Sequence, residues 1–145
     1  MASTITVGPA PLNFSVRKGS TLQRAITWYD EPVYLDPLET EVDPVASVRK
    51  DLTGWTARMQ VRDKRTNTLV YELTTENNGL FLGGASGTIA FYLSDGMTDY
   101  PEYDKCKYDL EMIDPNGMVI PLIAGSFTLP NQVTDTNVRP ASSRI

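Results

Sequence analysis

The sequence predicts an all-β protein, an antiparallel sandwich of about seven strands with one short helical turn. Two observations predict this class. Apolar and polar residues alternate over many short stretches, which is the pattern of strands that bury one face. The 145 residues also include ten Gly and ten Pro, enough to end the strands at frequent turns. Short strands joined mostly by turns are typical of a sandwich.

Residues 51–73 show the clearest strand pattern, that of a β-hairpin. The first half alternates an inward set with an outward polar set, and the predicted inward set is Trp55, Ala57, Met59 and Val61. Residues 63–67 are polar and form the expected connection. The second half resumes the alternation with Leu69, Tyr71 and Leu73 facing inward. Both halves therefore predict antiparallel strands with one buried face.

The N-terminal part predicts an extended arm followed by two strands. Residues 1–11 are small and end in Pro9-Ala10-Pro11, which indicates an arm outside the domain. Residues 12–16 alternate as a first short strand, and residues 18–20 form a turn. A second strand follows over residues 21–28, with Trp28 expected as a core anchor.

Residues 29–50 differ in character from the strands on either side. They contain Pro32, Pro37 and Pro44, and six acidic residues precede the first basic one. Three prolines oppose both a continuous helix and a central strand. We therefore expect a long acidic loop, and loops of this length are either functional or solvated insertions. Contact with a partner and simple solvation both remain open at this point.

The C-terminal half predicts four further strands. Residues 80–82 form a minor strand, and residues 87–93 face Ile89, Phe91 and Leu93 inward. A helical turn starts at Ser94 or Asp95 and ends at Pro101. The next strand buries alternate residues, and these are Cys106, Tyr108, Leu110 and Met112. A turn over residues 114–117 leads to the last strand, residues 118–129, in which Pro121 favours an edge or a bulge. Residues 130–145 lack periodicity and form the expected tail, so the sandwich domain spans residues 12–129.

Composition excludes several classes of function. The net charge of −5 argues against nucleic acid as a partner, because phosphate binding needs clustered basic residues. No apolar run reaches the length of a membrane span, and the first ten residues lack the features of a signal peptide, so we expect no membrane partner and no export. Histidine is absent, which removes the commonest general base and metal ligand. We expect no cofactor and no enzymatic activity.

Some residues still invite a chemical interpretation. Asp109 and Glu111 lie on one strand face and could serve as the carboxylate pair of a carbohydrate hydrolase, or as a ladder of ion pairs with Arg58 and Arg62. The lone Cys106 lies between two lysines, which could lower its pKa, or it is a small buried residue.

Three weaker patterns favour structural roles. The run over residues 83–87 is rich in glycine but lacks the Lys-Ser/Thr of a phosphate loop, so we expect a turn. The spacing of Asp104, Asp109, Asp114 and Asn116 does not match a calcium loop. Four tyrosines could form a sugar-stacking surface but are more often core or interface residues; they are Tyr92, Tyr100, Tyr103 and Tyr108.

Several segments together resemble structural proteins of tailed-bacteriophage particles. They are LNFSVRKGSTLQRAITW, DLTGWTARMQVRDKRTNTLVYELTTENNG, LGGASGTIAFYLS, YDLEMIDPNGMVIPLIAGSFTL and NQVT. Their order resembles the immunoglobulin-like N-terminal domain of the baseplate upper protein. The resemblance implies an immunoglobulin-like sandwich located in the virion, assembled in the host cytoplasm and in contact with other virion proteins and with symmetry copies of itself.

The resemblance implies an assembly module of the tail or baseplate that attaches tail or fibre components. Capsid decoration and a place in the head–tail neck are alternatives, and a carbohydrate-binding or hydrolysing module is a further one. We expect partner contacts at both chain ends and on the acidic loop, because unpatterned ends fray unless they are tied down. The candidate contact residues are Pro9, Pro11, Asp36, Glu39, Glu41, Asp43, Val133, Val138 and Arg139.

Overall fold

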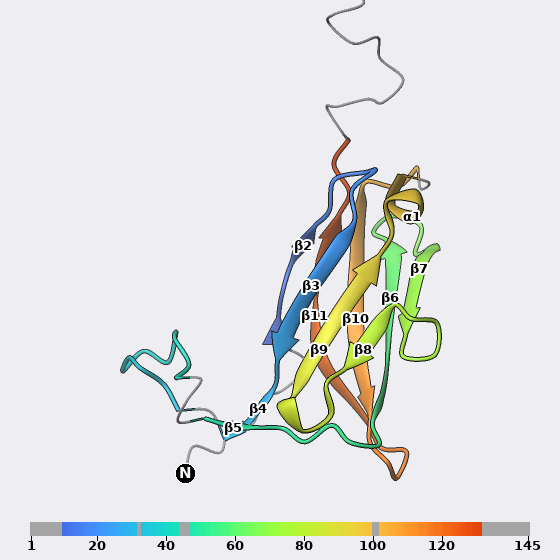
Figure 1. The fold of residues 1–145 in the computed structure, drawn as a ribbon. Helices are drawn as coiled ribbons and strands as arrows, with labels where there is room; N and C mark the ends of the chain where they lie inside the picture. The colour runs from blue at the N-terminus through green and yellow to red at the C-terminus, as the bar shows by residue number, and fades with distance from the viewer. Residues whose placement is uncertain (1–9, 32, 44–46, 100–101, 132–145) are drawn as a thin grey trace, which may run out of the picture.

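The computed structural model describes residues 10–31, 33–43, 47–99 and 102–131 and contains two β-sheets packed face to face (Figure 1). The larger sheet orders its strands β1, β11, β10, β6 and β7, and β2 also pairs with β11. The smaller sheet orders its strands β3, β9 and β8. The predicted antiparallel all-β sandwich is therefore confirmed.

The strands of the larger sheet are β1 (Ala10–Pro11), β2 (Phe14–Ser15), β6 (Thr56–Asp63), β7 (Leu69–Thr74), β10 (Lys105–Ile113) and β11 (Val119–Thr128). Those of the smaller sheet are β3 (Leu22–Thr27), β8 (Leu80–Leu82) and β9 (Thr88–Leu93). A separate pair consists of β4 (Tyr29–Glu31) and β5 (Val48–Arg49), and the helical segments are η1 (Gly84–Ser86) and α1 (Asp95–Asp99).

The predicted hairpin is present as β6 and β7, and its inward set is buried with two exceptions. Ala57, Met59 and Val61 are buried, and so are Tyr71 and Leu73. Trp55 is only partly buried. The prediction for Leu69 is wrong, since the side chain is 44% exposed. The pairing shifts register between Val61 and Arg62, which places Leu69 opposite the outward-facing Arg62.

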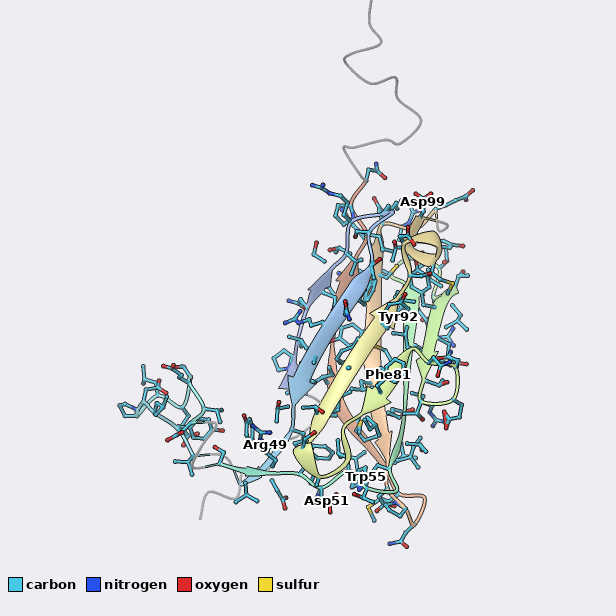
Figure 2. The ribbon with its side chains drawn as sticks, in the orientation of Figure 1. Arg49, Asp51, Trp55, Phe81, Tyr92 and Asp99 are labelled. Carbon is cyan, nitrogen blue, oxygen red and sulfur yellow. The ribbon has the colours of Figure 1, made fainter. Side chains whose placement is uncertain are left out.

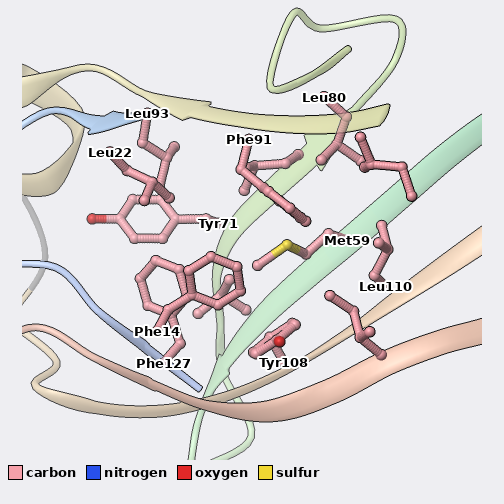
Figure 3. Close-up of a cluster of buried hydrophobic side chains, with 14 of the residues drawn as sticks. Phe14, Leu22, Met59, Tyr71, Leu80, Phe91, Leu93, Tyr108, Leu110 and Phe127 are labelled. Carbon is pink, nitrogen blue, oxygen red and sulfur yellow. The ribbon is translucent and has the colours of Figure 1, made fainter. Parts of the chain in front are cut away.

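An aromatic cluster fills the space between the two sheets (Figure 3). Phe14 lies at its centre, with its ring centroid 5.2 Å from that of Phe91 in the smaller sheet. On the other side the Phe14 ring lies 5.1 Å from the ring of Tyr108 in β10. Both contacts are edge-to-face, the geometry that aromatic quadrupoles favour. A two-residue strand thus links the two layers through one side chain.

The N-terminal strand differs from the prediction because it is divided in two. Ala10 and Pro11 pair in parallel with Ile123 and Ala124, so the boundary of the expected arm at residue 11 is wrong by these two residues. Asn13 interrupts the pairing, and its side-chain oxygen accepts a hydrogen bond from the amide of Ser126 at 3.0 Å. A Cβ at residue 125 would overlap the backbone of Leu12, so only glycine fits beside this interruption.

The C-terminal strands match their predictions closely. Cys106, Tyr108, Leu110 and Met112 are all buried. The predicted turn at residues 114–117 is present, with Gly117 at a φ of 89°. A bulge in the β10–β11 pairing lies beside Pro121, as expected for a residue without an amide proton. Pro101, the expected end of the helical turn, lies outside the described residues.

The helical turn α1 is attached to the sandwich at two points. The hydroxyl of Tyr71 donates to the carbonyl of Met97 at 2.8 Å, and Thr98 donates to the carbonyl of Ser20. The predicted core role of Trp28 is only partly confirmed, since this side chain is half-buried at the margin of the core.

Because Phe14 contacts both sheets, we expect Phe14→Ala to lower the free energy of unfolding by about 3–5 kcal/mol. Phe81→Ala is the matched control, because this side chain is half-exposed on the outer surface. The control substitution is expected to lower the free energy of unfolding by less than about 1 kcal/mol. Urea denaturation measures both values, and equal costs for the two variants would contradict the central role of Phe14.

Candidate functional site

The described residues between 29 and 50, which are 29–31, 33–43 and 47–50, form a hairpin that projects from one end of the sandwich (Figure 1). β4 and β5 pair at its base, and a bridge between Tyr34 and Val42 pairs its outer part. The expectation of a loop without strands is therefore wrong. Pro37 does not prevent this arrangement, because it lies in the turn between Tyr34 and Val42, outside the paired backbone. We call residues 29–50 the projecting hairpin.

The base of the projecting hairpin is bonded to the sandwich. The amide of Trp28 donates to the carbonyl of Gly87 at 2.9 Å, and the amide of Lys50 donates to the carbonyl of Trp28 at 2.9 Å. Gly87 has a φ of 69°, and a Cβ there would approach the carbonyls of Trp28 and Lys50 too closely. The glycine therefore allows both chain segments to enter the projecting hairpin side by side.

Two tryptophans and a lysine pack at the same base. The rings of Trp28 and Trp55 are edge-to-face, with centroids 5.5 Å apart. The Lys50 ammonium lies 5.5 Å from the Trp28 centroid and 5.6 Å from the Trp55 centroid. It also forms an ion pair with Asp30 at 3.6 Å. Cation–π attraction of this kind contributes roughly 0.5–1 kcal/mol at exposed sites, so the cluster helps to hold the base in place.

The distal turn of the projecting hairpin is organised by the carboxylate of Asp36. One carboxylate oxygen accepts hydrogen bonds from the amides of Thr40 and Glu41, at 3.0 and 2.9 Å. The other accepts a hydrogen bond from the Thr40 hydroxyl. Glu39 lies within this turn at a φ of 59°, a backbone conformation that residues other than glycine seldom adopt. The Asp36 hydrogen bonds hold the backbone in that conformation.

These hydrogen bonds change the acidity of Asp36. The Thr40 hydroxyl and the Glu41 amide favour the charged carboxylate, so the pKa of Asp36 is lowered from its usual value. Asp36 was predicted as a contact residue, but its carboxylate serves the turn itself. Asp36 thus positions the turn, and its contact with a partner stays a prediction.

The projecting hairpin exposes apolar side chains that sequence reasoning missed. Leu38 at the distal turn is 82% exposed and Leu35 is 59% exposed, and Val33 and Val48 are also exposed. A group of exposed apolar side chains on an element that is bonded to the sandwich is a candidate interaction site. The sequence does carry a signal for these apolar residues, because leucine and valine occur between each pair of successive prolines in this segment. The acidic residues around them make the segment as a whole resemble a solvated loop.

The remaining predicted contact residues are divided between the sandwich and the chain ends. Pro11 is exposed in β1, where it pairs with the chain's own β11. Glu39, Glu41 and Asp43 lie on the projecting hairpin, where the backbone of Glu41 bonds to that of Leu35 and the backbone of Asp43 to that of Val33. Pro9, Val133, Val138 and Arg139 lie outside the described residues.

The predicted ladder of ion pairs forms only in part. Arg58 and Glu111 are opposite each other and form an ion pair at 2.8 Å. Arg62 lies opposite Lys107 and instead donates to the side chain of Gln60 at 2.9 Å. Asp109 and Glu111 line a shallow polar groove of about 270 Å³ on the outer face of the larger sheet. Glu111 is thus engaged in an ion pair along the strand face.

Cys106 is fully buried, and its thiol is not activated by the neighbouring lysines. Side chains alternate along β10, so Lys105 and Lys107 point away from the face that holds the cysteine. Burial, with the charges of Asp63 and Asp104, raises the pKa of the Cys106 thiol to about 11. The interpretation of Cys106 as a small buried residue is confirmed.

The other patterns separate in space or form turns. Tyr108 is buried, Tyr92 is exposed and Tyr100 lies outside the described residues, so the tyrosines do not make one stacking surface. The glycine-rich run forms η1 and feeds β9, as predicted. Within the described residues, no group of three potential ligands gathers to hold a metal ion. None of the helices in that part of the chain is long and apolar enough to span a membrane.

Comparison with known proteins adds no assignment. No family model matches the chain, and no curated protein matches it as a relative.

We expect Asp36→Ala to open the distal turn without unfolding the sandwich. The amides of Thr40 and Glu41 should exchange with solvent at least about tenfold faster, while the melting temperature stays within about 2 °C. Hydrogen exchange measured by NMR tests this, and Glu39→Gln is the control because the same turn keeps its Asp36 bonds.

The same hydrogen bonds predict a pH dependence. Folding lowers the pKa of Asp36 from its usual value of 3.8. The charged carboxylate therefore stabilises the turn fully above pH 3.8, and this stabilisation is lost as the pH falls through the lower pKa of the folded state. At acidic pH, the hydrogen-exchange rates of the Thr40 and Glu41 amides in the wild type should therefore approach those in Asp36→Ala. Equal protection of Thr40 and Glu41 in both proteins at neutral pH would refute the assigned role.

Proposed function

We propose that this protein is a non-enzymatic structural module of a tailed-bacteriophage particle, which attaches tail or fibre components at the tail or baseplate. Its partners are other virion proteins and copies of itself. The observation that carries an assembly role is the projecting hairpin, an anchored element that displays Leu35 and Leu38 to solvent. The resemblance of several segments to phage virion proteins supports the setting.

The projecting hairpin suits docking for an energetic reason. Its base is held by the Trp28–Lys50–Gly87 hydrogen bonds and its turn by Asp36, so little conformational entropy is lost when a partner binds. Exposed leucines supply apolar area, while Glu39 and Glu41 beside them favour a partner with basic residues around an apolar pocket. This combination predicts binding that weakens as salt concentration rises.

The distribution of strands supports the immunoglobulin-like part of the proposal. β3, β9 and β8 share one sheet, and β6, β10 and β11 share the other with β7 at its edge. In immunoglobulin-like sandwiches the second, fourth and fifth strands pair in one sheet and the third, sixth and seventh in the other. The assignment of this chain to that fold family remains a prediction.

Two other positions on a particle are alternatives within the same function. Capsid decoration requires hundreds of copies on a lattice, and a neck component requires a single ring. A small contact area for each copy suffices in either case, because neighbouring sites raise the effective concentration. The anchored projecting hairpin fits attachment at a few defined positions, and this favours the tail or baseplate.

Copy number distinguishes capsid decoration from a place in the tail or the neck. We expect quantitative mass spectrometry of purified particles to find about six or twelve copies of the protein in each, as for closed rings in a tail. Copies in the hundreds would indicate capsid decoration instead. Absence of the protein from purified particles would overturn the proposed function.

Incorporation into particles tests the contact residues. We expect Leu38→Asp to reduce incorporation at least about tenfold, since a central apolar contact is replaced by a charge. Met118→Asp is the matched control, because Met118 is 64% exposed on a turn outside the projecting hairpin.

Deletion of residues 131–145 should also reduce incorporation, and normal incorporation of a folded deletion variant would exclude the tail as a contact.

A further inference from the structure

The outer face of the smaller sheet carries no charged side chain. Alternation along β3, β9 and β8 turns one set of residues toward the other sheet and the other set outward. In the edge strand β3 the inward-facing Arg24 lies over the Phe14 ring and remains exposed. The outward set is Gln23, Ala25, Thr27, Phe81, Thr88, Ala90 and Tyr92. The outer face of the larger sheet carries charges instead, including Arg58, Arg62, Lys107, Asp109 and Glu111. We call the uncharged surface the β3–β9–β8 face.

The strand register arranges the β3–β9–β8 face as three rows. Ala25, Ala90 and Phe81 lie in the central row, with Ala90 in the middle. Gln23 and Tyr92 lie in the row on one side, and Thr27 and Thr88 in the row on the other. Figure 2 looks onto this face and shows Phe81 and Tyr92 on adjacent strands.

The two aromatic side chains lie on one part of the face. Phe81 and Tyr92, which we call the aromatic ridge, lie on β8 and β9 and are 51% and 42% exposed. They line a hollow together with Glu72, a residue of the neighbouring β7. The β3 side carries only small or medium residues, with Ala25 opposite Ala90. A two-fold axis through Ala90 would place the aromatic ridge of one copy over the small residues of the other.

Charge limits which surface of this protein can contact another copy. Each copy carries a net charge of −5, so two copies repel each other in general. Near a two-fold axis every charged residue also approaches its own symmetry mate. A face without charges avoids this repulsion, and interface centres are typically depleted in charge and enriched in aromatic residues. We propose that the β3–β9–β8 face is the contact between two copies of this chain.

The size of the face indicates a weak contact. Two strands of six residues and one of three, about 4.8 Å apart, cover roughly 240 Å². A standard interface buries about 800 Å² on each partner, so isolated copies should associate with a dissociation constant of roughly 10⁻⁵–10⁻³ M. In a particle, copies held side by side reach an effective concentration of about millimolar. This contact deepens the proposed assembly role and depends on that role only for its setting.

The test uses purified full-length protein in sedimentation equilibrium up to about 500 µM. We expect a monomer–dimer equilibrium that becomes tighter between low and high salt, because salt screens the repulsion between two acidic copies. An interaction of two copies through the projecting hairpin would instead be lost in Leu38→Asp. Monomers at every concentration and salt would overturn the proposal.

Charge substitutions at the centre of the face locate the contact. Ala90→Glu and Ala90→Lys should each weaken association at least about tenfold, because like charges then meet near the axis. An equimolar mixture of the two variants should associate again. Ala124→Glu and Ala124→Lys are matched controls, since Ala124 lies opposite Asp109 on the charged outer face of the larger sheet. Equal effects at both positions would refute the assignment.

A further variant tests the contact in case Ala90→Glu and Ala90→Lys do not fold. Phe81→Ser removes half of the aromatic ridge at an exposed position and should weaken association at least about tenfold while the near-ultraviolet circular dichroism is retained. Unchanged association in folded Phe81→Ser would contradict the proposed face. These measurements need no particle, so their outcome is independent of the incorporation and copy-number experiments.

Discussion

The register of β10 with its two neighbours is the constraint on which the sandwich depends. β10 runs through the centre of the larger sheet, and its alternate residues Cys106, Tyr108, Leu110 and Met112 are all buried. The same register places Arg58 opposite Glu111 on the outer face. A slip by one residue would drive these charges into the core and the apolar set into water, so no other pairing is compatible with a folded domain.

The two outer faces of the sandwich differ as a consequence of which sheet each strand joins. Outward positions of β6 and β10 carry arginine, lysine and carboxylates, which keep that face solvated. Outward positions of β3, β8 and β9 carry alanine, threonine and two aromatic rings. The sandwich therefore separates a solvated face from a face suited to contact, without any change in its core.

The projecting hairpin solves a different problem, which is how to hold a narrow element away from the core. Its hydrogen bonds are local, between Trp28, Lys50 and Gly87 at the base and around Asp36 at the turn. Such bonds contribute little to the core but reduce the entropy that a partner must otherwise remove. The leucines at its end then face solvent in a defined position.

The sequence by itself determined the class of the fold, most of the core and most of the turns. Alternation with period two is a local property, so it identified β6, β9 and β10 and their inward residues without knowledge of their partners. The turn at residues 114–117 was equally local, because proline and glycine restrict the backbone in known ways.

Only the tertiary structure decided the features that depend on which strands meet. The bulge that exposes Leu69 and the division of the first strand around Asn13 both follow from pairing between segments that are separate in the sequence. The projecting hairpin was misread because its prolines and acids predict a loop, whereas the Asp36 carboxylate and the Gly87 contacts order it. The uncharged β3–β9–β8 face was also invisible, since its residues come from three separate segments that pairing alone brings together.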